Sequence, residues 1–194
     1  VRNVIPGFRI DDDAIDNDVA LIRKTGAEFV MGKEAPDVKE LKAMGFDYIV
    51  LACGAEKKGR LNIEGNVMNV IDFLYAFKNG GELKLGRNVA VVGGGNTAMD
   101  VARAAKRAEG VEKVTLVYRR NRRYMPADLE ELELAIEDGV EFMELASPVK
   151  QANGKLVCNK MKLGDKDASG RRVPVETGET VEVDADTVIA AVGE

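Results

Sequence analysis

The sequence predicts a mixed α/β fold with a parallel sheet and a small antiparallel meander. Short apolar strands alternate with amphipathic helices over most of the chain, and three extended stretches with turn residues between them close it. The 194 residues are 45% hydrophobic and 31% charged. This composition favours one globular domain, or one domain with a piece of another, and it excludes a disordered chain.

The first 54 residues predict two helices and two strands. One helix begins at the acidic residues 11–13 and a shorter one covers residues 38–44, and a glycine follows each of them. A strand is predicted at residues 27–31. The uninterrupted apolar run at residues 48–52 predicts a second strand, which is buried on both faces of a parallel sheet.

The middle of the chain predicts a complete βαβ unit. A polar connection at residues 57–65 is interpreted as a domain junction, and a helix follows at residues 70–78. A strand at 88–92, a glycine turn, a helix at 96–108 and a strand at 114–118 then make up a unit close to the roughly 30 residues expected.

The last third predicts one more helix and the meander. Pro126 suits the first turn of an acidic amphipathic helix with Gly139 past its end, and its glutamates are interpreted as a solvated face. Three extended stretches follow, with Asn-Gly and Ser-Gly in the loops between them, at residues 140–151, 155–163 and 180–192.

A weak internal repeat indicates where the chain changes domains. Residues 47–54 align with residues 186–193, so that an Asp, an Ala and the final Gly coincide. We interpret Gly54 and Gly193 as crossovers, where the chain leaves one domain and returns to it after building another. The alternative is two unrelated buried strands.

Composition excludes several classes of function. The net charge of -5 argues against nucleic acid as a partner, and no apolar run is long enough for a membrane span. The chain has no histidine, and its two cysteines do not form a CxxC, so no metal site is predicted and any catalysis must come from a bound cofactor or from carboxylates. With no signal peptide and no initiator Met, it is interpreted as a cytoplasmic segment of a longer protein.

The glycine turn of the βαβ unit carries a dinucleotide-binding fingerprint. It has the GxGxxA form and follows a buried strand, and its residues are Gly93, Gly94, Gly95, Asn96, Thr97 and Ala98. Gly93 makes the tight turn, Gly95 lets the backbone approach a pyrophosphate, and Ala98 lets the helix pack close to the strand. The predicted fold is therefore Rossmann-like, of the FAD/NAD(P)-binding type. A purely structural glycine turn is the alternative.

Arginines at the end of the second strand predict the nucleotide. An NAD site would place an acidic residue there, but this chain has Arg119, Arg120, Arg122 and Arg123. Arg119 and Arg120 are the first candidates for a 2′-phosphate and Arg122 the next, whereas Arg123 is free to pair with the acidic helix that follows. The cofactor predicted is NADPH. A solvated basic run is the alternative.

These motifs resemble the glutamate synthase small-subunit type of flavoprotein. The resemblance is carried by residues 5–10, 51–55, 93–100, 117–120, 125–127 and 185–193. Residues 72–74 and 138–142 lean it weakly toward the selenate reductase type of iron-sulfur flavoprotein subunit. It implies an NADPH-binding domain that interrupts an FAD-binding Rossmann-like domain. Residues 1–60 would then be a partial FAD-binding-type piece, residues 61–185 the NADPH-binding domain, and residues 186–194 the return strand.

The resemblance also implies an activity. NADPH would reduce FAD, which passes electrons to iron-sulfur clusters in another domain or subunit. Gly93 to Ala98 with Arg119, Arg120 and Arg122 would hold NADPH, and Gly54 and Gly193 would lie at the crossovers. The FAD fingerprint and the cluster cysteines are missing here, so this segment alone is predicted to be inactive. The alternatives are a stand-alone NADP-binding module and a small-molecule NADP dehydrogenase without flavin.

Overall fold

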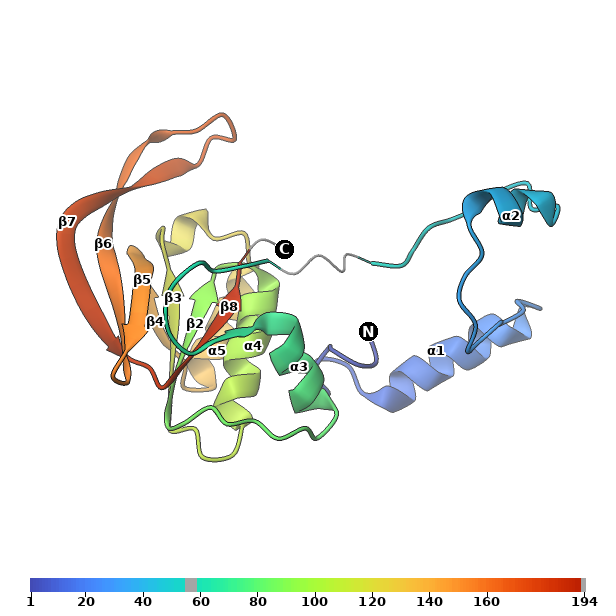
Figure 1. Cartoon of the computed structure of the whole chain (residues 1–194), viewed down its shortest axis with the longest axis horizontal. Coiled ribbons are helices and arrows are strands. Elements are labelled where there is room, and N and C mark those ends of the chain that lie inside the picture. The colour runs from blue at the N-terminus through green and yellow to red at the C-terminus, as the bar shows by residue number, and fades with distance from the viewer. Residues whose placement is uncertain (55–58, 193–194) are drawn as a thin grey trace. The chain divides into compact units, whose positions relative to one another are not determined.

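The computed structural model describes residues 1–54 and 59–192, and it divides the chain into two compact units. The larger unit contains residues 1–10 and 58–194, and the smaller one residues 11–57. Figure 1 labels most of the helices and strands of both units. Gly193, one of the two predicted crossovers, lies outside the described residues.

The smaller unit contains the two predicted helices, α1 (Asp12–Lys24) and α2 (Val38–Ala43). The side chain of Asp11 caps α1 by accepting a hydrogen bond from the amide of Ala14. Asp37 and Glu40 form a reciprocal capping box at the start of α2. Both helices are therefore specified by local sequence, as predicted.

The two predicted strands of the smaller unit are wrong for the part of the chain that is described. Residues 27–31 and 48–52 have no strand assignment, and the side chains of Tyr48 and Val50 are 91% and 87% exposed. A strand exists only through hydrogen bonds to a neighbouring strand. The apolar pattern is present, but these segments have no strand partner among the described residues.

A five-stranded parallel sheet forms the centre of the larger unit, in the order β1-β8-β2-β3-β4. Its strands are β1 (Val67–Asn69), β2 (Asn88–Gly93), β3 (Lys113–Tyr118), β4 (Glu141–Glu144) and β8 (Thr187–Ala191). Strand β8 lies between β1 and β2, so it belongs to the same sheet as the glycine turn. The predicted return of residues 186–194 to another domain, and the three-part division, stay predictions.

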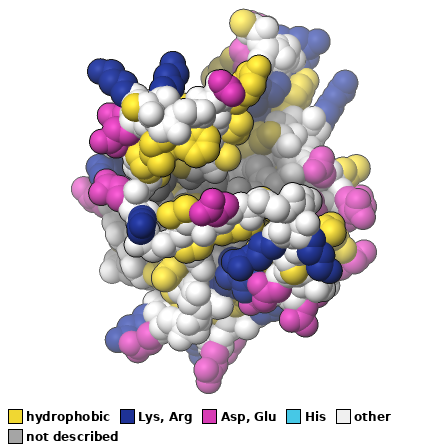
Figure 2. All heavy atoms as spheres, turned by 90° about the vertical axis from the view of Figure 1, so that its right-hand side faces the viewer, with side chains coloured by type: hydrophobic (Ala, Val, Ile, Leu, Met, Phe, Trp, Pro, Cys, Tyr) yellow, Lys and Arg dark blue, Asp and Glu magenta, His cyan; other side chains and the backbone are white. Residues whose placement is uncertain are grey.

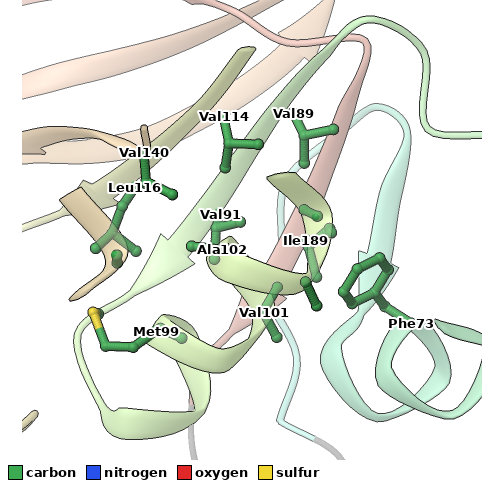
Figure 3. Packing of buried hydrophobic residues seen from close by; sticks show 14 of the residues in the cluster. Phe73, Val89, Val91, Met99, Val101, Ala102, Val114, Leu116, Val140 and Ile189 are labelled. Atoms are coloured by element: carbon green, nitrogen blue, oxygen red, sulfur yellow. The ribbon is translucent and has the colours of Figure 1, made fainter. Parts of the chain in front are cut away.

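Three helices cover one face of this sheet: α3 (Val70–Lys78), α4 (Asn96–Arg107) and α5 (Leu129–Glu137). Alternate side chains of the central strands, such as Val91, Leu116 and Ile189, are fully buried against them. Figure 3 shows Val101 of α4 and Phe73 of α3 beside Ile189. The predicted βαβ unit is thereby confirmed, with its helix held by the core.

The predicted meander is a separate antiparallel sheet on the other face, in the order β5-β6-β7. Its strands are β5 (Ala146–Ala152), β6 (Lys155–Lys166) and β7 (Arg172–Asp184). Two predicted stretches each span both sheets, because 140–151 supplies β4 and β5, and 180–192 supplies part of β7 and all of β8. Leu145 makes the first change of direction with a φ of 56°.

The surface carries charges of both signs. On the face shown in Figure 2, Lys and Arg side chains are interspersed with Asp and Glu rather than gathered in one broad basic area. None of the described helices is both long and apolar enough to cross a membrane.

Candidate nucleotide-binding site

A pocket of about 670 Å³ lies at the carboxyl end of β2, where the sheet order turns toward β3 on one side and β8 on the other. Open parallel sheets bind ligands at such a switch point. The pocket includes all six residues of the predicted fingerprint. Its lining residues are Arg60, Leu61, Val92, Gly93, Gly94, Gly95, Asn96, Thr97, Ala98, Val117, Tyr118, Arg119, Arg120, Pro126, Ala146, Ser147, Pro148, Arg171, Ala191 and Val192.

The three glycines of the turn differ in what surrounds them. A Cβ at Gly93 would lie 3.0 Å from the Cβ of Ala98 and 3.1 Å from the carbonyl carbon of Ala191. A Cβ at Gly94 would lie 2.6 Å from Cδ2 of the Tyr118 ring and closer still to its Cε2. A Cβ at Gly95 would meet no described atom within 4 Å, and Gly95 has an ordinary φ of -95°. Packing therefore explains two of the glycines, and Gly95 instead leaves open space inside the pocket.

Helix α4 begins at the floor of the pocket. Its first intrahelical hydrogen bonds run from the amides of Ala98 and Met99 to the carbonyl of Gly95. The amides of Asn96 and Thr97, which come before these bonds, therefore point out of the start of the helix. The helix is 12 residues long, and its dipole places partial positive charge at this end. An anionic group at this end would be stabilised.

The turn is braced from the segment before α5. The amide of Ala127 donates to the carbonyl of Gly94 at 3.0 Å, and the side chains and backbone of Asn96 and Asp128 exchange two hydrogen bonds. The side chain of Asn96 is thus a brace, which leaves its backbone amide for a ligand. Pro126 was predicted in the first turn of α5, but the helix begins at Leu129, and Pro126 lines the pocket instead.

The predicted arginines do not all lie in this pocket. Arg119 is exposed and lines it. Arg120 also lines it, but it is 7% exposed, and its Nε donates to the carbonyl of Arg172 at 2.8 Å. Arg122 lines a second pocket of about 850 Å³ on the other side of the short helix at 122–124. Arg119 is therefore the predicted arginine whose position best suits a ligand.

Two arginines that the sequence analysis missed complete the lining. Arg60 and Arg171 come from segments far from the fingerprint, and both line the pocket. Among the described residues that line it, four are arginines and none is acidic, although the chain as a whole has a net charge of -5. The lining of the pocket is therefore positively charged, and only tertiary structure reveals two of its cations.

Arg123 was expected to be free to pair with α5, but another arginine makes that contact. Arg9 donates from Nε to Asp100 at 2.5 Å and binds Glu131 of α5 with its other two nitrogens. Burial raises the pKa of the Asp100 carboxyl, while Arg9 acts in the opposite direction. Glu131, predicted on a solvated face, is thus a structural partner, and Asp100 lies outside the pocket lining.

The cysteines take no part in the pocket. Cys158 is buried, and burial raises the pKa of its thiol to about 11, so it is a protonated core residue at neutral pH. Cys53 is exposed. Gly54 is also exposed and has a φ of 80°. No cluster of potential metal ligands is found among the residues that the structure describes.

Comparison with known proteins agrees with this geometry. The chain is 46% identical, over its whole length, to the Escherichia coli (strain K12) protein named "Putative oxidoreductase YgfK", of which it spans 19%. It is 33% identical over 97% of its length to the glutamate synthase [NADPH] small chain of Azospirillum brasilense, of which it spans 44%. The predicted resemblance to that type of flavoprotein is confirmed, whereas the selenate reductase branch stays a prediction.

Solved structures confirm the fold class. The oxidoreductase FprA of Mycobacterium tuberculosis, solved in complex with NADPH, matches 81% of this chain and 52% of its own with a TM-score of 0.65 at 21% identity. The family described as pyridine nucleotide-disulphide oxidoreductase matches residues 12–194. The sequence match, the parallel sheet and the glycine turn together show that the chain belongs to the pyridine nucleotide-disulphide oxidoreductase family.

Proposed function

We propose that the chain binds NADP(H) in the pocket at the end of β2, as the nucleotide-binding segment of an NADPH-dependent flavin oxidoreductase. The observation that carries the proposal is Gly95, whose missing side chain leaves open space in a pocket lined by arginines. Protein packing does not require a glycine there, and we assign the open space to a ligand. The volume of about 670 Å³ lies within the range of small-molecule sites.

Each part of the dinucleotide has a place in this pocket. The start of α4 and Gly95 receive the pyrophosphate, because its oxygens accept hydrogen bonds from backbone amides. The adenosine half lies toward β3, where Arg119 reaches the 2′-phosphate, and the nicotinamide half lies toward β8. Two charge-assisted hydrogen bonds to the 2′-phosphate, discounted for exposure, contribute about 3 kcal/mol, which is roughly a hundredfold preference for NADP over NAD.

The chain's own residues bind and orient the cofactor, and no side chain is assigned a catalytic role. When bound beside the nicotinamide, FAD supplies the acceptor for the hydride. Arg120 and Arg122 remain candidates for the 2′-phosphate, Arg120 through the Nη1 nitrogen that its contacts with Arg172 and Asp167 leave open. Apolar residues such as Val92 and Leu61 limit the access of water to the pocket.

The FAD-binding part is proposed to lie largely elsewhere in the protein. The chain spans 19% and 44% of the two relatives named above, which leaves room for a complete FAD-binding domain and for iron-sulfur clusters in another domain or subunit. The apolar segments 27–31 and 48–52 would pair with the remaining strands of that domain, and Gly54 and Gly193 would mark the crossovers. A cytoplasmic location is part of the same proposal.

The proposal is tested by calorimetric titration of the full-length protein with NADP⁺ and NAD⁺, both of which bind without turnover. We expect a preference for NADP⁺ that weakens with salt, and a loss of most of that preference in Arg119→Ala. Arg87→Ala is the control, because Arg87 is an exposed arginine at the opposite end of β2, paired with Glu112. Equal binding of both nucleotides by the unchanged protein would contradict the proposal. Oxidation of NADPH with a carbonyl compound and without flavin would favour a small-molecule dehydrogenase instead.

A further inference from the structure

The turn between β6 and β7 is built around one carboxylate. Asp167 accepts hydrogen bonds at Oδ1 from the amides of Ser169 and Arg171 and from the hydroxyl of Ser169. The amide of Asp167 donates to the carbonyl of Arg171 at 2.8 Å, and Gly170 provides a φ of 80°. Hydrogen bonding to Ser169 lowers the pKa of the Asp167 carboxyl, so this carboxylate is charged at neutral pH. The turn therefore has a defined shape.

Arg120 fastens this turn to the end of β3. Its Nε donates to the carbonyl of Arg172 at 2.8 Å, and its Nη2 lies 3.6 Å from Oδ2 of Asp167. The side chain of Arg120 is 8% exposed, so these contacts are largely protected from solvent. The distal turn of the meander is thereby held beside the strand end that carries Arg119.

The same turn sends a second guanidinium into the pocket. Arg171 lines the pocket together with Tyr118 and Arg119, whereas Asp167 is not among the lining residues. The Nε of Arg171 donates to the hydroxyl of Ser169 at 3.0 Å, which fixes the side chain while its two terminal nitrogens have no hydrogen bond to any described residue. These nitrogens form the pair that binds phosphate oxygens in a bidentate manner.

We propose that Arg171 is a specificity-determining residue, which binds the 2′-phosphate of the nucleotide from the meander side while Arg119 binds it from β3. Arg120 then acts mainly as a positioning residue, because it holds the turn that carries Arg171. This inference rests on the proposed NADP(H) site, and it names a phosphate-binding residue that lies outside the glycine fingerprint. The ligand chemistry is a phosphate monoester on the adenosine ribose.

The test compares Arg171→Ala with Lys166→Ala in the full-length protein. Lys166 of β6 lies opposite Arg172 of β7 in the strand register and is not among the pocket-lining residues. Its replacement therefore removes one positive charge from the same hairpin without changing the pocket lining. The probes are NADP⁺, NAD⁺, adenosine 2′,5′-bisphosphate and 5′-AMP, measured by calorimetry. Thermal denaturation checks that both variants remain folded.

We expect Arg171→Ala to weaken NADP⁺ and adenosine 2′,5′-bisphosphate about tenfold, and to change NAD⁺ and 5′-AMP by less than about twofold. Arg171→Lys should restore part of the lost affinity, because the charge returns without the planar pair of donors. Lys166→Ala should leave all four affinities within about twofold, since an exposed charge that does not line the pocket is largely screened.

Three contrary outcomes are distinguishable. If the unchanged protein prefers NADP⁺ and Arg171→Ala keeps the whole preference, the role of Arg171 is refuted and the nucleotide site stands. An equal loss of all four ligands would also refute it, because it would show a general disturbance of the pocket. If the unchanged protein binds none of the probes, the proposed function itself fails, and the inference fails with it.

Discussion

Replacement of Gly95 by Ala separates a ligand-binding role of the glycine turn from a structural one. The added methyl group meets no described atom within 4 Å, and the φ of -95° is allowed for alanine. Loss of glycine at a helix N-cap costs a few tenths to 1 kcal/mol, and restriction of the unfolded chain returns about 0.4–1 kcal/mol. The free energy of unfolding should therefore change by less than about 1 kcal/mol.

Nucleotide affinity should respond much more strongly. The methyl group projects into the space where we place the pyrophosphate, so it would displace one hydrogen bond between a backbone amide and a charged oxygen. Such a bond is worth about 1.5–3 kcal/mol. Both NADP⁺ and NAD⁺ should then bind about 10- to 100-fold more weakly, because the pyrophosphate is common to the two nucleotides.

Gly93→Ala is the matched control, since it adds the same methyl group two residues earlier. That methyl group would press on Ala98 and on the backbone of Ala191, and overpacking of this kind costs about 1–3 kcal/mol. Calorimetry and thermal denaturation of both variants give the comparison. Unchanged affinity in a folded Gly95→Ala variant would refute the assignment of this open space to the pyrophosphate.

Three further predictions concern groups outside the pocket. Arg107 lowers the pKa of Asp138 below its ordinary value of 3.8. Asp138 therefore stabilises the fold above about that pH, and the stabilisation is lost as the pH falls. In urea denaturation, Asp138→Asn should lower the free energy of unfolding by about 1 kcal/mol at pH 7 and by less at pH 3. At pH 8, iodoacetamide should modify the exposed Cys53 in the native 194-residue chain and Cys158 only after unfolding, as mass spectrometry would show. Arg9→Ala should destabilise the fold by about 2–3 kcal/mol in the same denaturation assay, because Asp100 would stay buried without its cation.

Each of these has an outcome that would contradict it. If Asp138→Asn lowers the free energy of unfolding by the same amount at pH 3 and at pH 7, the ion pair with Arg107 is not the cause of the stabilisation. Rapid native-state labelling of Cys158 would mean that the interface between the two sheets opens. For Arg9→Ala the control is Arg87→Ala, because the exposed ion pair of Arg87 with Glu112 should contribute less than about 1 kcal/mol to the free energy of unfolding. If both substitutions lower the free energy of unfolding by the same amount, Arg9 contributes no more than an ordinary surface charge.

The glycine turn and its flanking strands could be predicted because local sequence and tertiary packing favour the same structure there. Strand β2 is a continuous apolar run, the turn has glycine where packing demands it, and Ala98 allows the close approach of α4 to β8. The helices of the smaller unit were predictable for another reason, since Asp11 and Asp37 cap them by contacts within a few residues.

The remaining features depend on partners that local sequence does not identify. The stretch 48–52 has the composition of a buried strand, but a strand needs a neighbour, and the described chain supplies none. The stretch 140–151 reads as continuous, yet Leu145 divides it between two sheets. Arg171 lies 52 residues after Arg119 in the sequence, and only the folded meander brings both to one pocket.

Hydrogen–deuterium exchange of the full-length protein, with and without NADP⁺, tests the location of the nucleotide most directly. NADP⁺ should slow amide exchange in peptides that cover residues 93–99 and 118–120, because bound phosphates engage the amides of the turn and close the pocket over the end of β3. Peptides of the second pocket near residues 128–132 should be unaffected. Protection confined to that second pocket, or no protection at residues 93–99 under saturating NADP⁺, would contradict the assignment.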